Sequence, residues 1–328
     1  MSGRGVSVYD LRRHDVSRCD LSGRDVGWRG ATRRLACALA AGRLALLLGV
    51  AVFAALATFD ARAVVVTDQR GAAVEIPAPP RRIVSLLPSL TESVCALGAC
   101  DRLVGVDRYS NWPASVHALP RVGGGLDPNV EAIVALKPDL VLISKSARAG
   151  ERLESLGLRV LVLEPENAAG AQRVLQQLGR ALGTGGADAV WARIDAGVDA
   201  AAKSLPPQAR GMRVYFEVND GPYAASESSF IGETLARLGA RNVVPGSLGP
   251  FPKLNPEFVV RADPELIMIG ERGAQALPRR PGWDRIGAVR AGRVCRFDSA
   301  EGDLLVRPGP RMDEAARWMA RCLAENAR

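Results

Sequence analysis

The sequence contains one block twice, and this duplication restricts the fold more than any other feature. EAIVALKPDLVLIS occupies residues 131–144, and EFVVRADPELIMIG occupies residues 257–270. The copies align without a gap, so that Pro138 matches Pro264. A second match, LGA at 97–99 and at 238–240, precedes each copy in the same order. General similarity among strand–helix units is the alternative explanation, but two ordered matches favour two lobes of similar architecture.

Strands and helices alternate along both halves of the chain. Short apolar runs such as DLVLIS are typical of strands buried on both faces, and segments such as ERLESLG indicate helices between them. After the strand in RRIVSLLPS, we expect a helix that is capped by Ser89 or Thr91 and ends at Gly98. This alternation predicts the α/β class, with parallel sheets covered by helices.

An Ala-rich segment separates the two halves. It begins after GTGG and has no Pro until Pro206, so it predicts one long, stiff helix. We therefore divide the chain into a leader with a signal peptide (1–63), an N-terminal α/β lobe (64–186), a linking helix (187–209) and a C-terminal α/β lobe (210–328).

The leader has the features of a secretory signal. The uncharged apolar run 44–59 follows Arg33, Arg34 and Arg43 and ends near the small-residue triplet at 61–63. An uncleaved membrane anchor is the alternative, although the run is short for a span of roughly 20 residues. The absence of Cys at the cleavage point argues against a lipid anchor there. We expect a protein released into the periplasm.

Export makes the cysteines informative, because disulfides persist in oxidising compartments. Four cysteines follow the leader: Cys95, Cys100, Cys295 and Cys322. They allow three pairings, of which we favour the local one, Cys95 with Cys100 and Cys295 with Cys322. Buried free thiols are the alternative. Cys19 and Cys37 lie in the leader.

Charge and motifs exclude several classes of function. The net charge is +8, but residues 1–63 hold ten Arg and five Asp, and the rest has 33 basic against 30 acidic residues. That mixed surface does not favour nucleic acid. Nucleophile-elbow, zinc-protease and phosphate-loop motifs do not occur, and His117 is the single histidine after the leader. We therefore expect no enzyme activity, no resident metal or cofactor, and a monomer.

Three segments together resemble a known family. RRIVSLLPSLTE, GVDRYSNWP and the EAIVALKPDLVLIS block are similar to the helical-backbone periplasmic binding proteins, the receptors of ABC importers for cobalamin, iron–siderophores and haem. The resemblance covers about residues 64–328 and is strongest to cobalamin-binding members. It implies two Rossmann-like lobes on one long rigid helix with a ligand cleft between them. It also implies a receptor that captures a corrinoid, cobalamin or cobinamide-like, and delivers it to a permease with its ATPase.

The resemblance gives the duplicated block a function. In the family, each lobe offers an acidic residue that docks onto Arg residues of the permease, and Glu131 and Glu257 occupy those positions. Charge pairing of this kind aids capture and orientation. The alternative is that both are first-turn helix residues favoured by the helix dipole.

The ligand is expected where strands of both lobes end and loops begin. Aromatic side chains on such loops can stack on a flat macrocycle. These candidates are Tyr109, Trp112, Tyr223, Phe230 and Phe251.

A polar pair completes the candidate site. Asp303 and Arg307 resemble the pair that family members place under a corrinoid, although Arg307 could instead be a solvated loop residue. Arg311 is expected to begin the last helix.

One departure from the family leaves the ligand open. Cobalamin receptors usually have an aromatic residue before the docking helix, where this chain has glycines at 123–125. This weakens the expectation of cobalamin itself and leaves room for a corrinoid precursor such as a cobinamide, or for another chelate. A siderophore or haem receptor is the second candidate, because Tyr109 and Tyr223 could serve as axial ligands. An exported enzyme or a signalling ectodomain represents a different class.

Overall fold

The computed structural model describes residues 63–219, 221 and 223–327 of the 328-residue chain. The predicted signal peptide, the apolar run 44–59 and the cysteines at positions 19 and 37 lie outside the described residues. Among the helices that are described, none has the length and apolar character required to cross a membrane.

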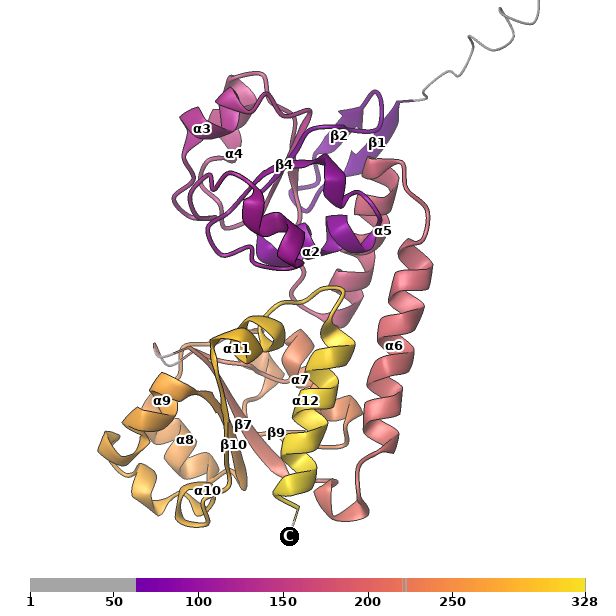
Figure 1. Cartoon of the computed structure of the whole chain (residues 1–328). Helices are drawn as coiled ribbons and strands as arrows, with labels where there is room; N and C mark the ends of the chain where they lie inside the picture. The colour runs from indigo at the N-terminus through magenta and orange to yellow at the C-terminus, as the bar shows by residue number, and fades with distance from the viewer. Residues whose placement is uncertain (1–62, 220, 222, 328) are drawn as a thin grey trace, which may run out of the picture. The chain divides into compact units, whose positions relative to one another are not determined.

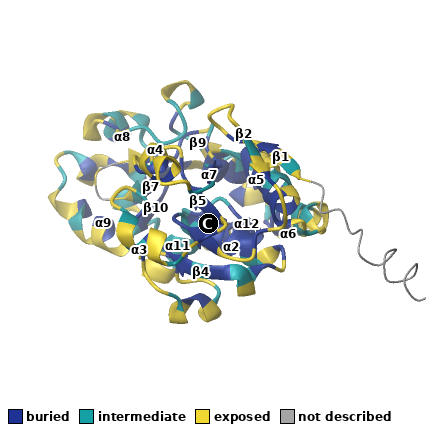
Figure 2. Cartoon of the chain, turned by 90° about the horizontal axis from the view of Figure 1, so that it is seen from above, coloured by how far each residue is buried: buried dark blue, intermediate teal, exposed yellow. Residues whose placement is uncertain are grey.

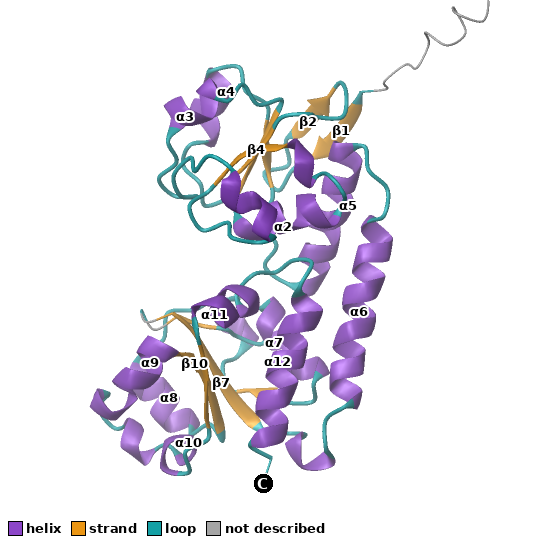
Figure 3. Ribbon diagram, in the orientation of Figure 1, coloured by secondary structure: helices purple, strands orange, loops and turns teal. Residues whose placement is uncertain are grey.

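The first half of the described chain forms a small hairpin and a four-stranded parallel sheet (Figure 3). The hairpin pairs β1 (Val64–Thr67) with β2 (Ala73–Ile76) in antiparallel orientation. The sheet has the order β4-β3-β5-β6, and every residue of β3, β5 and β6 is buried. Its strands are β3 (Ile83–Ser85), β4 (Leu103–Val106), β5 (Leu140–Ile143) and β6 (Val160–Val162).

Helices cover this sheet, and the first of them differs from its prediction. Helix α2 (Pro88–Ala96) has Leu87 at its N-cap, so the predicted caps Ser89 and Thr91 are wrong. Pro88 is suited to the first helical position because the missing N–H is unsatisfied there anyway. The other helices of this half are α3 (Val130–Ala135), α4 (Gly150–Ser155) and α5 (Ala168–Leu182), with 3-10 turns at Cys100–Arg102 and Ala114–Ala118.

The second half repeats the strand order of the first. Strands β10 and β11 follow β7 in parallel, while β9 and the antiparallel β8 pair with different parts of the other edge of β7. The order β9-β7-β10-β11 therefore matches β4-β3-β5-β6, and the predicted two α/β lobes are confirmed. The strands are β7 (Arg213–Asn219), β8 (Tyr223–Ala224), β9 (Arg241–Asn242), β10 (Leu266–Gly270) and β11 (Val294–Phe297).

The helices of the second half surround this sheet. They are α7 (Phe230–Arg237), α8 (Pro256–Ala262), α9 (Glu271–Ala276), α10 (Gly287–Arg290), α11 (Ser299–Leu305) and α12 (Met312–Glu325). Short 3-10 turns lie at Pro207–Ala209, Gly246–Leu248, Leu277–Arg279 and Trp283–Arg285.

The duplicated block forms the same joint in both lobes. In each copy a residue with left-handed backbone, Lys137 (φ 46°) or Asp263 (φ 42°), follows the short helix, and a proline and an acidic residue come next. The acidic side chain then accepts backbone N–H groups at the start of the neighbouring strand. Asp139 accepts from Arg82 at 2.9 Å, and Glu265 accepts from Arg213 at 2.9 Å. The repeated residues therefore form the connection between a short helix and the buried strand that follows it.

The long helix α6 (Ala187–Lys203) forms where the Ala-rich segment predicts it. It packs against α5 of the first half and lies beside α12 of the second (Figure 1). Ile194 and Val198 are buried in a core that also includes residues of both sheets. Figure 2 shows how buried residues gather inside while exposed residues lie on the outer loops. Helix α6 is therefore part of the packed core and is not an isolated strut.

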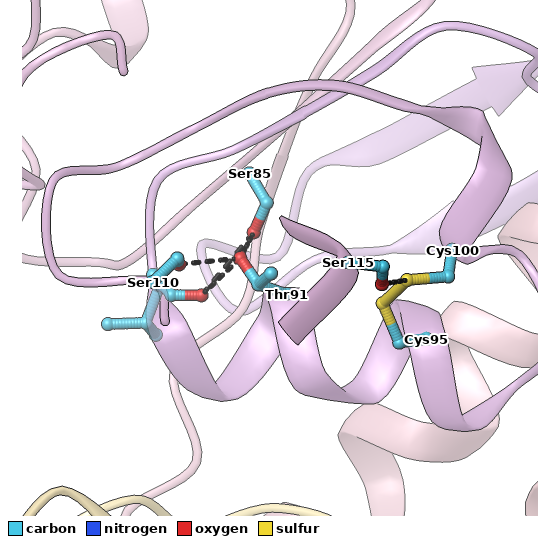
Figure 4. Close-up of a disulfide and its surroundings, with 7 residues drawn as sticks. Ser85, Thr91, Cys95, Cys100, Ser110 and Ser115 are labelled. Atoms are coloured by element: carbon cyan, nitrogen blue, oxygen red, sulfur yellow. Dashed lines mark hydrogen bonds between the residues drawn. A yellow bond between two sulfur atoms is a disulfide. The ribbon is translucent and has the colours of Figure 1, made fainter. Parts of the chain in front are cut away.

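Both predicted disulfides are present. Cys95 and Cys100 join the end of α2 to the next turn, close to the Ser115 hydroxyl (Figure 4). Cys295 and Cys322 join β11 to α12. The local pairing is confirmed, and the alternative of free thiols is wrong for these four residues.

Candidate functional site

A cavity lies where strands of both lobes end. Its volume is about 420 Å³, within the range of small-molecule sites. Most of its lining is apolar and comes from the segment after β3, from β7, and from the helices and loops of the second lobe. The apolar residues include Leu87, Pro88, Phe230, Phe251, Val306 and Pro308.

Two further hollows adjoin this cavity. One, of about 190 Å³, lies in the first lobe and shares Leu87, Pro88 and Tyr109 with the main cavity. The other, of about 320 Å³, lies in the second lobe and shares Val218 and Asp303 with it. The three hollows therefore lie next to one another, and residues of both lobes line them. We refer to them together as the cleft.

Three of the five predicted aromatic residues line the cleft. Tyr109 follows β4, and 60% of its surface is exposed. Phe251 and Phe230 contact each other edge to face, with ring centroids 5.7 Å apart. Phe230 is buried at the start of α7, so the more exposed rings of Tyr109 and Phe251 are better placed to contact a ligand.

The structure does not bring the other two aromatic residues to the lining of these hollows. Trp112 contacts Arg311: the guanidinium carbon of Arg311 lies over the Trp112 ring, 4.8 Å from the centroid of that ring. Tyr223 lies in β8, which pairs with the end of β7 at Asn219. Tyr223 also forms an antiparallel bridge with Lys253, and the residue is 40% exposed.

Asp303 and Arg307 line the main cavity and form an ion pair of 2.9 Å. Arg307 is almost fully buried, which excludes the interpretation as a solvated loop residue. Its guanidinium donates to Glu92 Oε1 at 2.9 Å, to Asn111 Oδ1 at 2.7 Å and to the backbone carbonyl of Tyr109 at 3.0 Å.

Glu92 is a residue that sequence reasoning did not assign to the site. Its carboxylate is buried on α2 and accepts two hydrogen bonds from Arg311, at 2.9 and 2.7 Å, besides the one from Arg307. Arg311 begins α12, as predicted. Its pKa is raised: burial opposes the charged form, but the hydrogen bonds and charge of Glu92 outweigh that effect. We call Glu92, Asp303, Arg307 and Arg311 the Glu92 cluster.

The Glu92 cluster joins the two lobes across the cleft. Glu92 belongs to the first lobe, whereas both arginines belong to the loop between α11 and α12 in the second. A buried acidic residue inside the apolar helix LTESVCALGA is the one signal in the sequence that could have indicated a buried partner, because unpaired buried charges are rare.

A second buried carboxylate lies beside the small hollow. Asp107 ends the strand β4 and is fully buried. It accepts the Tyr109 N–H at 2.7 Å and the Ser110 hydroxyl. Burial raises the pKa of Asp107, and these two hydrogen bonds partly oppose that shift. Ser110 in turn contacts the Thr91 hydroxyl (Figure 4), so this network fixes the loop that carries Tyr109.

Glu131 and Glu257 lie outside the cleft lining. Both are exposed on the first turns of α3 and α8. Asn129 and Asn255 cap these helices at equivalent positions. The matched sequence positions are therefore matched in structure as well.

Metal-binding groups are not apparent in the part of the chain that the structure describes. No cluster of three or more His, Cys, Asp or Glu side chains suited to a metal ion occurs there. His117 Nε2 lies 2.8 Å from the carbonyl of Asn111, with which it shares a hydrogen bond.

The chain is similar in sequence to known proteins. The periplasmic binding protein family matches residues 83–301 of the chain. The chain belongs to this family. An uncharacterized ABC transporter substrate-binding lipoprotein of Bacillus subtilis is 30% identical to it, over 78% of this chain and 84% of the relative. A vitamin B12-binding protein of Vibrio vulnificus is 26% identical, over 71% of this chain and 86% of the relative.

A solved structure agrees with the fold. A periplasmic heme-binding protein of Pseudomonas aeruginosa is 27% identical, with a TM-score of 0.63, and the match covers 75% of this chain and 93% of that protein. The predicted architecture, two lobes with a cleft, is confirmed by the structure and by this similarity. The named relatives are binding proteins and not enzymes.

Proposed function

We propose that this protein is a periplasmic receptor that captures a corrinoid, such as cobalamin or a cobinamide, and delivers it to an ABC importer. The observation that carries this proposal is the group of adjoining hollows at the ends of strands from both lobes. Its main cavity has apolar walls and an exposed phenol ring at Tyr109, which suits a large flat ring. The vitamin B12-binding relative supports the ligand class, and the ABC transporter relative supports the importer.

The glycine loop supports a corrinoid precursor over cobalamin itself. Gly125 lines the small hollow at the place where the resemblance leads us to expect an aromatic ring. A Cβ atom at Gly125 would lie 3.0 Å from the carbonyl oxygen of Leu86, so a larger residue would crowd this wall. The hollow therefore offers room beside the ligand ring and no aromatic stacking from residues 123–125.

Haem is the second candidate, because of Tyr109. Its exposed phenol lines the cavity, and tyrosine is an axial ligand that some haem proteins use. The heme-binding structural relative agrees with this alternative.

Delivery would use the two exposed glutamates. Glu131 and Glu257 lie at equivalent positions on the two lobes and outside the cleft lining, so they can contact a permease while a ligand is bound. We propose that they pair with arginines of the transmembrane subunits, whose ATPase drives import. The receptor acts as a monomer, and its signal peptide is cleaved after export.

Visible absorption spectra test the ligand. The exported protein is incubated with cobalamin, cobinamide, haem or a ferric siderophore and then desalted. We expect a corrinoid spectrum to remain with the protein. A haem spectrum alone would show that the second candidate is correct, and retention of none of the four would overturn the proposal.

Three variants test the site. Tyr109→Ala and Phe251→Ala should each weaken corrinoid binding by about tenfold or more, because each removes a ring from the cavity wall. Tyr223→Ala is the matched control, since it removes an exposed tyrosine outside the lining of the three hollows. Calorimetry measures all three. Equal losses in the three variants would contradict the assigned site.

A further inference from the structure

Carboxylates outnumber cationic groups along the cleft. Over the described residues, two guanidinium groups line the three hollows, those of Arg272 and Arg307. Arg272 already has an interaction within the protein. The carboxylates that line the same hollows are Asp107, Asp127, Glu164, Glu217, Glu271, Asp298 and Asp303. Even with some of them paired, an anionic ligand group enters a region of negative charge.

The hydrogen bonds of Arg307 leave little for a ligand. Nη1 donates to Glu92 and Asn111, and Nη2 donates to the Tyr109 carbonyl and pairs with Asp303. Each terminal nitrogen of a guanidinium carries two N–H groups. Nη1 and Nη2 each have two partners, so all four of these N–H groups are used within the protein. Asn111 also donates to Asp303 at 2.7 Å, which closes the ring of contacts. An anion could bind Arg307 strongly only by displacing one of these partners.

Glu92 also binds the guanidinium of Arg311, the second arginine of the Glu92 cluster. Arg311 binds both oxygens of Glu92, and the Trp112 ring covers its guanidinium. With Asp303 included, the Glu92 cluster contains two carboxylates and two guanidinium groups, so its formal charges cancel. Removing the negative charge of Glu92 would leave the cluster with one positive charge beside the cavity.

We propose that Glu92 determines which ligand charge the cleft accepts. It holds Arg307 and Arg311, and it thereby withholds their cationic N–H groups from carboxylate groups of a ligand. The cleft therefore takes a chelate whose periphery carries amides or other neutral or cationic groups, and it rejects the same ring with a carboxylate periphery. This inference rests on the proposed function, and it adds a rule about ligand charge. Glu92 is a positioning residue, since it acts through the two arginines.

Two corrinoids with the same ring test the rule. Cobinamide carries amides around its ring, whereas cobyrinic acid carries carboxylates in their place. The measured quantity is the ratio of their dissociation constants for one protein. Wild-type protein should prefer cobinamide by at least about tenfold. In Glu92→Gln the ratio should move toward cobyrinic acid by about tenfold, and the shift should shrink as salt is raised, because salt screens the added charge.

A second variant protects the test against misfolding. Asp303→Asn also adds one positive charge to the cluster, and the Asp303 side chain is 34% exposed, so this variant should fold. It should move the ratio in the same direction. Asp313→Asn is the matched control: Asp313 is buried and holds Arg193 and Arg317, but it does not line the cleft. Its ratio should equal that of the wild type.

The outcomes separate this rule from the proposed function. If wild-type protein binds cobyrinic acid as tightly as cobinamide, the rule is wrong while a corrinoid receptor remains. An unchanged ratio in both Glu92→Gln and Asp303→Asn would also overturn it. If wild-type protein binds neither corrinoid, the proposed function is wrong. The same variants with haem and its dimethyl ester, in which methyl esters replace the charged propionate carboxylates, then decide the charge rule on its own.

Discussion

The two disulfides should stabilise the protein by different amounts, and the difference follows from the loops that they close. Cys295–Cys322 closes a loop with a sequence separation of 27, whereas Cys95–Cys100 closes one of 5. Cross-linking restricts the unfolded chain more when the loop is longer. The chain-entropy relation gives about 3.5 kcal/mol for the long loop and about 2 kcal/mol for the short one. Cys322 is also buried, so its removal leaves a small cavity that adds to the larger loss.

Paired alanine variants test this order. Urea unfolding, followed by far-ultraviolet circular dichroism, gives the free energy of unfolding for the wild type, for Cys95→Ala/Cys100→Ala and for Cys295→Ala/Cys322→Ala. The second variant should lose about 1.5 kcal/mol more than the first. Reductant should lower the stability of the wild type and leave a variant lacking both disulfides unchanged. An equal loss in the two paired variants, or a larger loss for the short loop, would refute the loop argument.

Three further predictions concern docking, pH and shape. Glu131→Ala/Glu257→Ala should leave ligand affinity unchanged and weaken binding of the loaded receptor to vesicles containing the importer, most strongly at low salt; a loss of ligand affinity would instead place the duplicated block in the ligand site. Because the pKa of Asp107 is raised above 3.8 in the folded protein, its contribution to stability is present below that value and is lost as pH rises through the folded pKa. The stability of wild type relative to Asp107→Asn should therefore fall as pH rises above 3.8, and a rise in that direction would show that the sign is wrong. Because α6 (Ala187–Lys203) packs against α5 and α12, small-angle scattering curves with and without ligand should nearly superimpose, and a marked compaction on binding would contradict a stiff connection.

Local patterns predicted most elements of the fold. The strand β5 (Leu140–Ile143) is an uninterrupted apolar run, and α6 is rich in the best helix former, so each is determined largely by its own residues. The start of α2 was not predictable in this way. Thr91 is of a residue type that is common at N-caps, but its hydroxyl contacts Ser85 and Ser110, which belong to other segments. The Thr91 hydroxyl is therefore used in contacts with other segments, and it does not cap α2.

The candidate site was predictable where a residue follows a parallel strand. Tyr109 follows β4 and reaches the cleft, because the ends of parallel strands share one edge of the sheet. Tyr223 also follows a strand, β7, but it lies in β8, which runs antiparallel to β7, and it does not line the three hollows. The contacts of Glu92 join residues 215 and 219 positions apart, and no local pattern encodes such pairs.

The joint that the duplicated block forms has a consequence for how the importer could recognise a loaded receptor. In both lobes a left-handed residue, a proline and an acidic side chain lie between the short helix, α3 or α8, and the strand that follows it, and they restrict the direction of that helix. Glu131 and Glu257 therefore move as rigid extensions of their sheets. The distance between α3 and α8 then changes mainly when one lobe moves relative to the other, so a permease that binds both glutamates would respond to the spacing of the lobes.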